Sequence, residues 1–433
     1  MLTLGQLRKY VLVFLAATLS STVVLKIAEI QYLELIFAID FLFLLGMFAW
    51  NGLQVRIYRP FLEIGKSYAL FLGLAFLLSF FSLQQDFSYS IHDSVLKKPI
   101  LVTVARCVEM FLDVFYMLYL ATLFREDEKI CIFGAKTFYW TAIAGCVYSF
   151  ATYPLNVASG LALGTYGEMH RFRGFDNEGG SFGLYLMSVC ILAFVMYRRN
   201  WLSRRQFLFG MAILITGIIG SQSKSTFIAV GLLGVINMTW FHRGWKRWTM
   251  IAGMFAGLVA VGSVLNFPAL LNAYIRGSET YQEMSNLRAD DGNFVMGRVA
   301  GAVLAPRMIA TRPVLGIGWG NYPLVRDDRD YRQGTAFAIT STDAPGLGIV
   351  DYIVELGIPL WIYLTWIELK PVFMLRRRGV DLNLVSLALV LPISNWVGAH
   401  LNLTHLWIVV AIALGMGYQT RSREILIAES VSA

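Results

Sequence analysis

Long apolar runs recur along the whole chain, and they constrain its fold more than any other feature. Runs of roughly 17–25 apolar residues are long enough to cross a bilayer as helices. Hydrophobic residues make up 57% of the chain and charged residues only 15%, whereas soluble domains average about 45–50% and about 25%. The sequence therefore predicts an all-α protein, a polytopic membrane helix bundle.

About twelve transmembrane helices are predicted, with a large, partly helical loop between the ninth and the tenth. The first run, YVLVFLAATLSSTVVL, lacks a convincing cleavage site after it, so we expect a retained helix and not a signal peptide. The last two runs are short and could instead form one re-entrant hairpin. The predicted spans cover 10–27, 30–50, 66–84, 99–123, 137–158, 181–197, 206–221, 225–241, 249–270, 346–367, 383–399 and 401–418.

Arginine and lysine alternate between the segments that connect these spans. Rich segments lie near residues 8–9, 56–66, 125–136, 198–205, 243–247, 370–378 and 421–423, and the segments between them are poorer. Because basic loops stay in the cytoplasm, both termini are predicted to be cytoplasmic. Segment 160–180 and the long loop 271–345 are then external.

The loop at 271–345 is far longer than an ordinary connection, which indicates a function or structure of its own. It holds eight arginines, eight acidic residues and no lysine. A guanidinium group binds phosphate or carboxylate through two parallel hydrogen bonds, which lysine cannot do. A network of arginine–carboxylate pairs is the alternative reading for most of these arginines. Within the loop, 295–311 is predicted to form an amphipathic helix.

Three short polar segments could carry chemistry. HRFRGFDNEGG, residues 170–180, places arginines beside glycines just before a predicted helix, and helix N-termini favour anions. SQSKST, residues 221–226, holds Lys224, which could contact phosphate or extend to the membrane interface. RPVLGIGWGNY, residues 312–322, has glycines but no preceding strand, so nucleotide binding is rejected.

Charged residues inside the spans are functional hypotheses because they are costly in lipid. In the fourth span, Arg106, Glu109 and Asp113 share a face and could neutralise one another. Asp351 and Glu355 lie one turn apart near the external end of the tenth span, and Asp40 is expected to be isolated in the second. The histidines and the four cysteines have no metal-type spacing, so neither a metal site nor a disulfide framework is predicted.

Together these segments resemble the O-antigen ligase and O-antigen polymerase superfamily of bacteria. The resemblance covers roughly 165–420 and rests on RFRGFDNEGG, SQSKST, GRVAGAVLAPRMIATRPVLGIGWGNY and YIVELGIPLW, in that order. It implies N-terminal transmembrane helices at 1–160 and a ligase- or polymerase-like core at 161–433 that includes loop 271–345. It also implies a multi-pass protein of the bacterial inner membrane.

The resemblance implies a glycosyltransferase reaction on the periplasmic face. A glycan would move from undecaprenyl pyrophosphate to a hydroxyl group of an acceptor glycan, as in an O-antigen or exopolysaccharide polymerase or ligase. The activated donor requires no cofactor and no metal. The lipid bilayer and other polysaccharide assembly proteins would be its surroundings and partners, and no nucleic acid is expected, because the basic residues form no continuous patch.

The resemblance also assigns residues. Arg173 matches the family's arginine before glycine, and Arg298 matches the arginine at the start of its loop helix. The general base stays open between His170, Asp343 and another carboxylate, because the histidine that ligases carry before ELG is absent. Further candidates for substrate binding are Arg171, Arg312, Lys224 and Glu355.

Two other classes of protein remain as alternatives. A transporter or flippase of lipid-linked oligosaccharides would need charged residues along a path across the whole membrane. A non-catalytic scaffold of a secretion complex would not need arginine pairs at membrane level.

Overall fold

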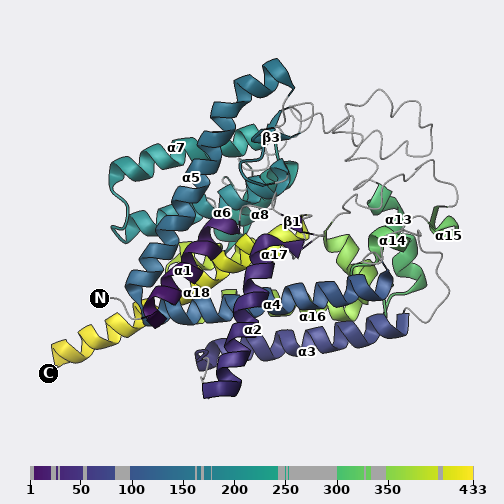
Figure 1. The fold of residues 1–433 in the computed structure, drawn as a ribbon, viewed down its shortest axis with the longest axis horizontal. Helices are drawn as coiled ribbons and strands as arrows, with labels where there is room; N and C mark the ends of the chain where they lie inside the picture. Colours follow the sequence, from purple (N-terminus) through teal and green to yellow (C-terminus); the bar gives the residue numbers. More distant parts are fainter. Residues whose placement is uncertain are drawn as a thin grey trace.

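Helices build almost all of the described structure (Figure 1). The computed structural model describes residues 4–20, 26–27, 30–51, 56–82, 98–160, 163–166, 170–176, 178–241, 249, 252, 300–325, 328–332, 348–397 and 403–432. The elements are α1 Leu4–Leu19, β1 Lys26–Ile27, β2 Ile30–Gln31, α2 Tyr32–Asn51, α3 Arg59–Ser82, α4 Pro99–Glu126, α5 Glu128–Ser159, β3 Thr165–Tyr166, β4 Arg171–Phe172, α6 Gly179–Arg198, α7 Arg204–Ser221, α8 Lys224–Phe241, α13 Ala300–Thr311, α14 Tyr322–Val325, α15 Arg329–Arg332, α16 Ile349–Arg377, α17 Leu382–Trp396 and α18 Thr404–Ser432. Because the strands in this part of the chain form only two short hairpins, the all-α prediction is confirmed for the described residues.

The predicted count of twelve spans is not confirmed. Among the described residues, five helices are long and apolar enough to cross a membrane, namely α3, α4, α5, α6 and α16. Most of the remaining predicted spans also form helices, but several are short, and 249–270 lies outside the described residues apart from two positions. α17, for example, has 15 residues and extends only about 22 Å, less than the roughly 30 Å of a bilayer's hydrocarbon core. An apolar run in the sequence does not reveal where turns and caps end its helix.

Several of the basic segments that were predicted to share one side lie close together among the described residues. Arg198, at the end of α6, forms an ion pair with Asp381 before α17, with 2.9 Å between nitrogen and oxygen. Arg199, the next residue, donates a hydrogen bond to the carbonyl of Met416 in α18. Arg125 of α4 stacks on Tyr58, which precedes α3. We call this end of the molecule the basic end.

Helix α18 forms the centre of the bundle. Its residues from Thr404 to Tyr418 are all buried, and it packs against α4 and α17. Small residues allow the close approach, since a Cβ atom on Gly415 would lie only 2.4 Å from the Cβ of Phe124 in α4. α3 packs on both α4 and α16, and these helices lie side by side in the lower part of Figure 1. Helices from either side of residue 160 therefore share one hydrophobic core.

The predicted helix at 295–311 appears as α13, which begins at Ala300; residues 295–299 lie outside the described part. Its buried residues Leu304, Ala305 and Met308 follow one another at helical spacing. This face packs on α16, and its residues Ala305 and Met308 belong to the same buried cluster as Val354 of α16. Ile309 is partly buried against the same cluster, as an amphipathic helix requires.

Candidate functional site

The segment RFRG forms a hairpin at the end of the bundle opposite the basic end. β3 and β4 pair antiparallel, with Tyr166 opposite Arg171 and Thr165 opposite Phe172. The pairing continues as a hydrogen bond of 3.1 Å from the amide of Arg173 to the carbonyl of Gly164. The amide of Asp176 then closes a turn on the carbonyl of Arg173 at 2.9 Å. Arg171 therefore begins this short strand and Arg173 directly follows it, and the hairpin pairing holds the backbone of both.

Two buried polar residues of α5 attach this hairpin to the bundle. The hydroxyl of Ser149 donates to the carbonyl of Gly164 at 2.8 Å and accepts from the amide of Gly174 at 2.9 Å. The side chain of Asn156 accepts from the amide of Leu163 at 3.0 Å and donates to its carbonyl. Sequence reasoning missed both residues, because a serine and an asparagine within an apolar helix give no signal of their distant partners.

The two motifs HRFRGFDNEGG and SQSKST meet at this hairpin. The Nε atom of Arg171 donates to the carbonyl of Ser221, 50 residues away in sequence, at 3.1 Å. The α6 and α8 helices approach so closely that a Cβ atom on Gly183 would lie 2.4 Å from the hydroxyl oxygen of Thr226. Only glycine permits this contact without displacing α8. The paired glycines and the SQSKST segment thus belong to one structural unit.

Two helix N-termini lie next to each other in this unit. The Ser223 hydroxyl accepts a hydrogen bond of 3.1 Å from the amide of Thr226 in the first turn of α8. The same hydroxyl donates to the carbonyl of Gly180, in the first turn of α6, at 3.3 Å. Because a helix N-terminus carries a partial positive charge, the two starts make this place electropositive.

Four of the predicted site residues lie in this unit, and all four are half-buried: His170, Arg171, Arg173 and Lys224. Lys224 is the first residue of α8. His170 has a φ of 49°, and its ring centroid lies 6.2 Å from that of Tyr153 in α5. Asp176 is buried beside the hairpin, and Glu178 is exposed. We refer to residues 163–166, 170–176, 178–183 and 221–226 as the hairpin unit.

The glycine-rich segment 312–322 packs against a break in helix α16. α16 is interrupted at Gly357, whose φ of 73° and ψ of 163° are not helical. The carbonyl of Val354 accepts from the amide of Ile317 at 3.0 Å, and the amide of Ile358 donates to the carbonyl of Pro313 at 2.8 Å. Backbone groups freed by the break are therefore satisfied by this segment, as apolar surroundings require.

Helices α3 and α4 hold the same segment from the other side. The Ser79 hydroxyl accepts from the amide of Trp319 at 2.9 Å, and Thr103 donates to the Trp319 carbonyl at 2.8 Å. The carboxylate of Glu355 accepts a hydrogen bond of 3.1 Å from the amide of Tyr322. Glu355, a predicted substrate-binding residue, thus has an observed contact that positions the loop.

The other predicted site residues are distributed as follows. Arg312 directly follows α13 and is half-buried, and its amide bonds to the carbonyl of Met308 at 3.1 Å. It belongs to the segment held by α3, α4 and α16, whereas α5–α8 hold the hairpin unit. Arg298 and Asp343 lie outside the described residues, so the convergence of Arg298 with Arg173 stays a prediction.

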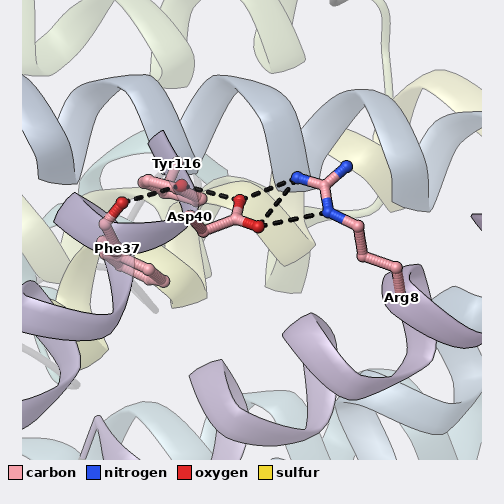
Figure 2. Close-up of polar contacts among 4 residues, drawn as sticks. All are labelled: Arg8, Phe37, Asp40 and Tyr116. Atoms are coloured by element: carbon pink, nitrogen blue, oxygen red, sulfur yellow. Dashed lines mark hydrogen bonds and ion pairs between the residues drawn. The ribbon is translucent and has the colours of Figure 1, made fainter. Parts of the chain in front are cut away.

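Two charged residues within the helices, Arg106 and Asp40, form ion pairs. In α4, Arg106 forms an ion pair of 2.9 Å with Glu109, as expected. The expectation that Asp40 is isolated is wrong. Figure 2 shows the Asp40 carboxylate between the guanidinium of Arg8 in α1, at 2.8 and 2.9 Å, and the hydroxyl of Tyr116 in α4, at 2.8 Å. Its partners come from two other helices, and a single apolar run cannot reveal them.

A second buried polar pair was missed entirely. The side chain of Asn395 in α17 donates a hydrogen bond of 2.8 Å to the carboxylate of Glu368 in α16. Both residues are buried. Buried carboxyls in membrane helices often belong to ion or substrate pathways.

Within the described residues, no group of three or more histidine, cysteine, aspartate and glutamate side chains could hold a metal ion. Comparison of the sequence with models of known protein families gave no match, and comparison with curated proteins gave none either.

Proposed function

We propose that the protein is a glycosyltransferase that moves a glycan from undecaprenyl pyrophosphate to a hydroxyl of a second glycan. It would act on the periplasmic face of a bacterial inner membrane, as a polymerase or ligase of O-antigen or exopolysaccharide. The proposal starts from the resemblance of its motifs to the O-antigen ligase and polymerase superfamily.

The observation that supports it best is the meeting of two of those motifs. Arg171, Arg173 and Lys224 are brought together with the starts of α6 and α8 by the hydrogen bond from Arg171 to Ser221. This bond fixes the Nε atom of Arg171, and its two terminal nitrogens make no hydrogen bond within the described residues. A guanidinium group that is oriented in this way is suited to bind a phosphate oxygen pair through its two terminal nitrogens.

The reaction needs little beyond stabilisation of a leaving group. The acceptor hydroxyl oxygen attacks the anomeric carbon, the bond from that carbon to the pyrophosphate oxygen breaks, and the hydroxyl proton passes to a base. A single in-line displacement inverts the anomeric centre. Negative charge develops on the departing pyrophosphate, and the cations of the hairpin unit would stabilise it in the transition state. Asp343 or His170 would take the proton.

A transporter of the same lipid-linked glycans is the second candidate. The buried pair of Glu368 and Asn395 favours it, because it places a carboxyl inside the bundle and away from the hairpin unit. The two functions differ in outcome, since a transporter leaves every glycosidic bond unchanged.

The experiment is deletion of the gene followed by complementation with Arg171→Lys and Arg173→Lys at matched membrane levels. Lysine keeps the charge and loses the fork, so polymer formation should fall about 10²–10³-fold if the lost contact belongs to the transition state. Arg204→Lys is the control, because Arg204 is exposed at the basic end. Normal polysaccharide from both hairpin variants would contradict the proposed role.

A further inference from the structure

Segment 415–419 of α18 is the meeting point of three helix ends at the basic end. The carbonyl of Met416 accepts the hydrogen bond from Arg199, which follows α6. The side chain of Gln419 donates to the carbonyl of Phe124, near the end of α4. The guanidinium of Arg378, which follows α16, lies over the ring of Tyr418. The C-terminal ends of α4, α6 and α16 therefore surround this short segment.

Two arginines at this place flank a pair of tyrosines. The guanidinium carbon of Arg125 lies 3.8 Å from the ring centroid of Tyr58, and that of Arg378 lies 3.4 Å from the centroid of Tyr418. The two tyrosine rings contact each other edge to face, with centroids 5.5 Å apart. We call Arg125, Arg378, Tyr58 and Tyr418 the arginine–tyrosine cluster.

Stacking on a tyrosine ring holds each guanidinium group in place, but the ring itself provides no acceptor for the N–H donors in the guanidinium plane. A guanidinium group has five N–H donors in its plane, and a ring beneath that plane accepts none of them along its edge. Within the described residues, neither Arg125 nor Arg378 makes a side-chain hydrogen bond or an ion pair. The Nε atom of Arg125 is buried without a partner. Both arginines are otherwise half-buried, so a ligand can reach them.

Helix carbonyls and nearby acids explain only part of this arrangement. An arginine at a helix C-terminus interacts favourably with the last carbonyls of that helix, whereas Arg199 donates to the carbonyl of Met416 in the interior of α18. Arg125 and Arg378 form no such side-chain bond with described residues. Among nearby acids, Asp127 accepts hydrogen bonds from the first amides of α5, and Asp381 is paired with Arg198. Among the described residues, two forked cations thus lack an acceptor at this end of the bundle.

We propose that the arginine–tyrosine cluster binds the phosphate of an anionic phospholipid. Basic residues lie together at this end of helices that are long enough to cross a membrane. The positive-inside rule predicts that the basic end faces the cytoplasmic leaflet, where anionic lipids are found. Tyrosine and tryptophan are enriched where membrane proteins cross the interface between lipid and water, and the cluster contains two tyrosines. The proposed site is independent of the glycosyltransferase proposal.

The test is thermal unfolding of the purified full-length protein in a neutral detergent. Phosphatidylglycerol, phosphatidylcholine with the same acyl chains, and inorganic phosphate are titrated separately against the wild type, Arg125→Gln with Arg378→Gln, and Arg205→Gln. The last variant removes an exposed basic residue at the same end and serves as the control. Half-saturation by phosphatidylglycerol should need at least about tenfold more lipid for the double variant than for the wild type, since charge-assisted hydrogen bonds are the strong ones and two guanidinium groups are lost.

Three outcomes would overturn the proposal. An equal loss in Arg205→Gln would mean that surface charge alone attracts the lipid. An equal response to phosphatidylcholine would exclude recognition of the headgroup, and saturation by inorganic phosphate with no further effect of lipid would exclude a lipid ligand. Because the glutamine variants could be poorly folded, Arg125→Lys with Arg378→Lys is measured too. These variants keep the charges but lose the forks, and they should still bind phosphatidylglycerol more weakly than the wild type.

Discussion

Substitution of Gly357 by alanine should destabilise the protein, which would not be expected if α16 were an ordinary continuous helix. Gly357 lies within an apolar helical run, and in such a place alanine normally stabilises a helix by about 1 kcal/mol. The structure predicts the opposite sign. Its φ of 73° and ψ of 163° lie in a region that only glycine occupies readily, and this strain costs alanine about 1–3 kcal/mol.

A second cost comes from the contact with segment 312–322. A Cβ atom at Gly357 would lie 2.2 Å from the carbonyl oxygen of Val314 and 2.5 Å from its carbonyl carbon. Both are backbone atoms of a segment fixed by α3, α4 and α16, so they cannot turn away as a side chain could. Overpacking of this kind costs about 1–3 kcal/mol. Gly357→Ala should therefore destabilise the protein by about 2–6 kcal/mol.

The assay is thermal unfolding in detergent at a fixed scan rate, with Gly73→Ala as the matched control. Gly73 lies in α3, and a Cβ atom there would meet nothing within 4 Å. The control should leave Tm unchanged or slightly higher, whereas Gly357→Ala should lower it by several degrees. If Gly357→Ala unfolds at or above the wild-type Tm, α16 is continuous and the account of the broken helix is wrong.

Three further predictions rest on other contacts. Asp40→Asn removes the ion pair between Arg8 and Asp40, whose side chains are 29% and 17% exposed, respectively, and should lower the stability by about 1–3 kcal/mol. Glu63→Gln removes an exposed ion pair with Lys66 and should leave Tm unchanged. Equal changes in Tm for the two variants would refute the predicted difference. Asn156→Ala breaks the bonds that hold the hairpin unit to α5 and should cost about 1–3 kcal/mol; polymer formation should fall with it, and wild-type Tm and activity together would refute this anchoring role. In a cysteine-free background, Glu178→Cys should react with an impermeant thiol reagent in intact cells and Arg204→Cys only after permeabilisation; the reverse pattern would invert the topology and exclude a periplasmic reaction.

The sequence predicted the helices well, because each apolar run carries its own signal. Several of the basic segments predicted to share one side also lie close together among the described residues, as the contacts of Arg198, Arg199 and Arg125 show, whereas the side of the membrane stays a prediction. The count of spans failed because composition does not show where a helix ends. The span that corresponds to α17 was predicted to reach residue 399, and yet the helix ends at Trp396.

Contacts between distant residues were beyond the sequence for a different reason. Asp40 reads as an isolated charge because its partners, Arg8 and Tyr116, are 32 and 76 residues away. Nothing local to segment 312–322 indicated that a helix would break at Gly357 to receive it. The motifs HRFRGFDNEGG and SQSKST could be recognised in the sequence, but their contact through Ser221 required the structure.

Reconstitution of the purified protein with a donor glycan on undecaprenyl pyrophosphate tests the central claim most directly. The donor is placed in liposomes with an acceptor glycan, and the products are separated by size and by lipid attachment. The account predicts a longer glycan and one released undecaprenyl pyrophosphate for each bond formed, with both products strongly reduced for Arg171→Lys. Movement of intact donor between leaflets without any new glycosidic bond would contradict it and favour the transporter.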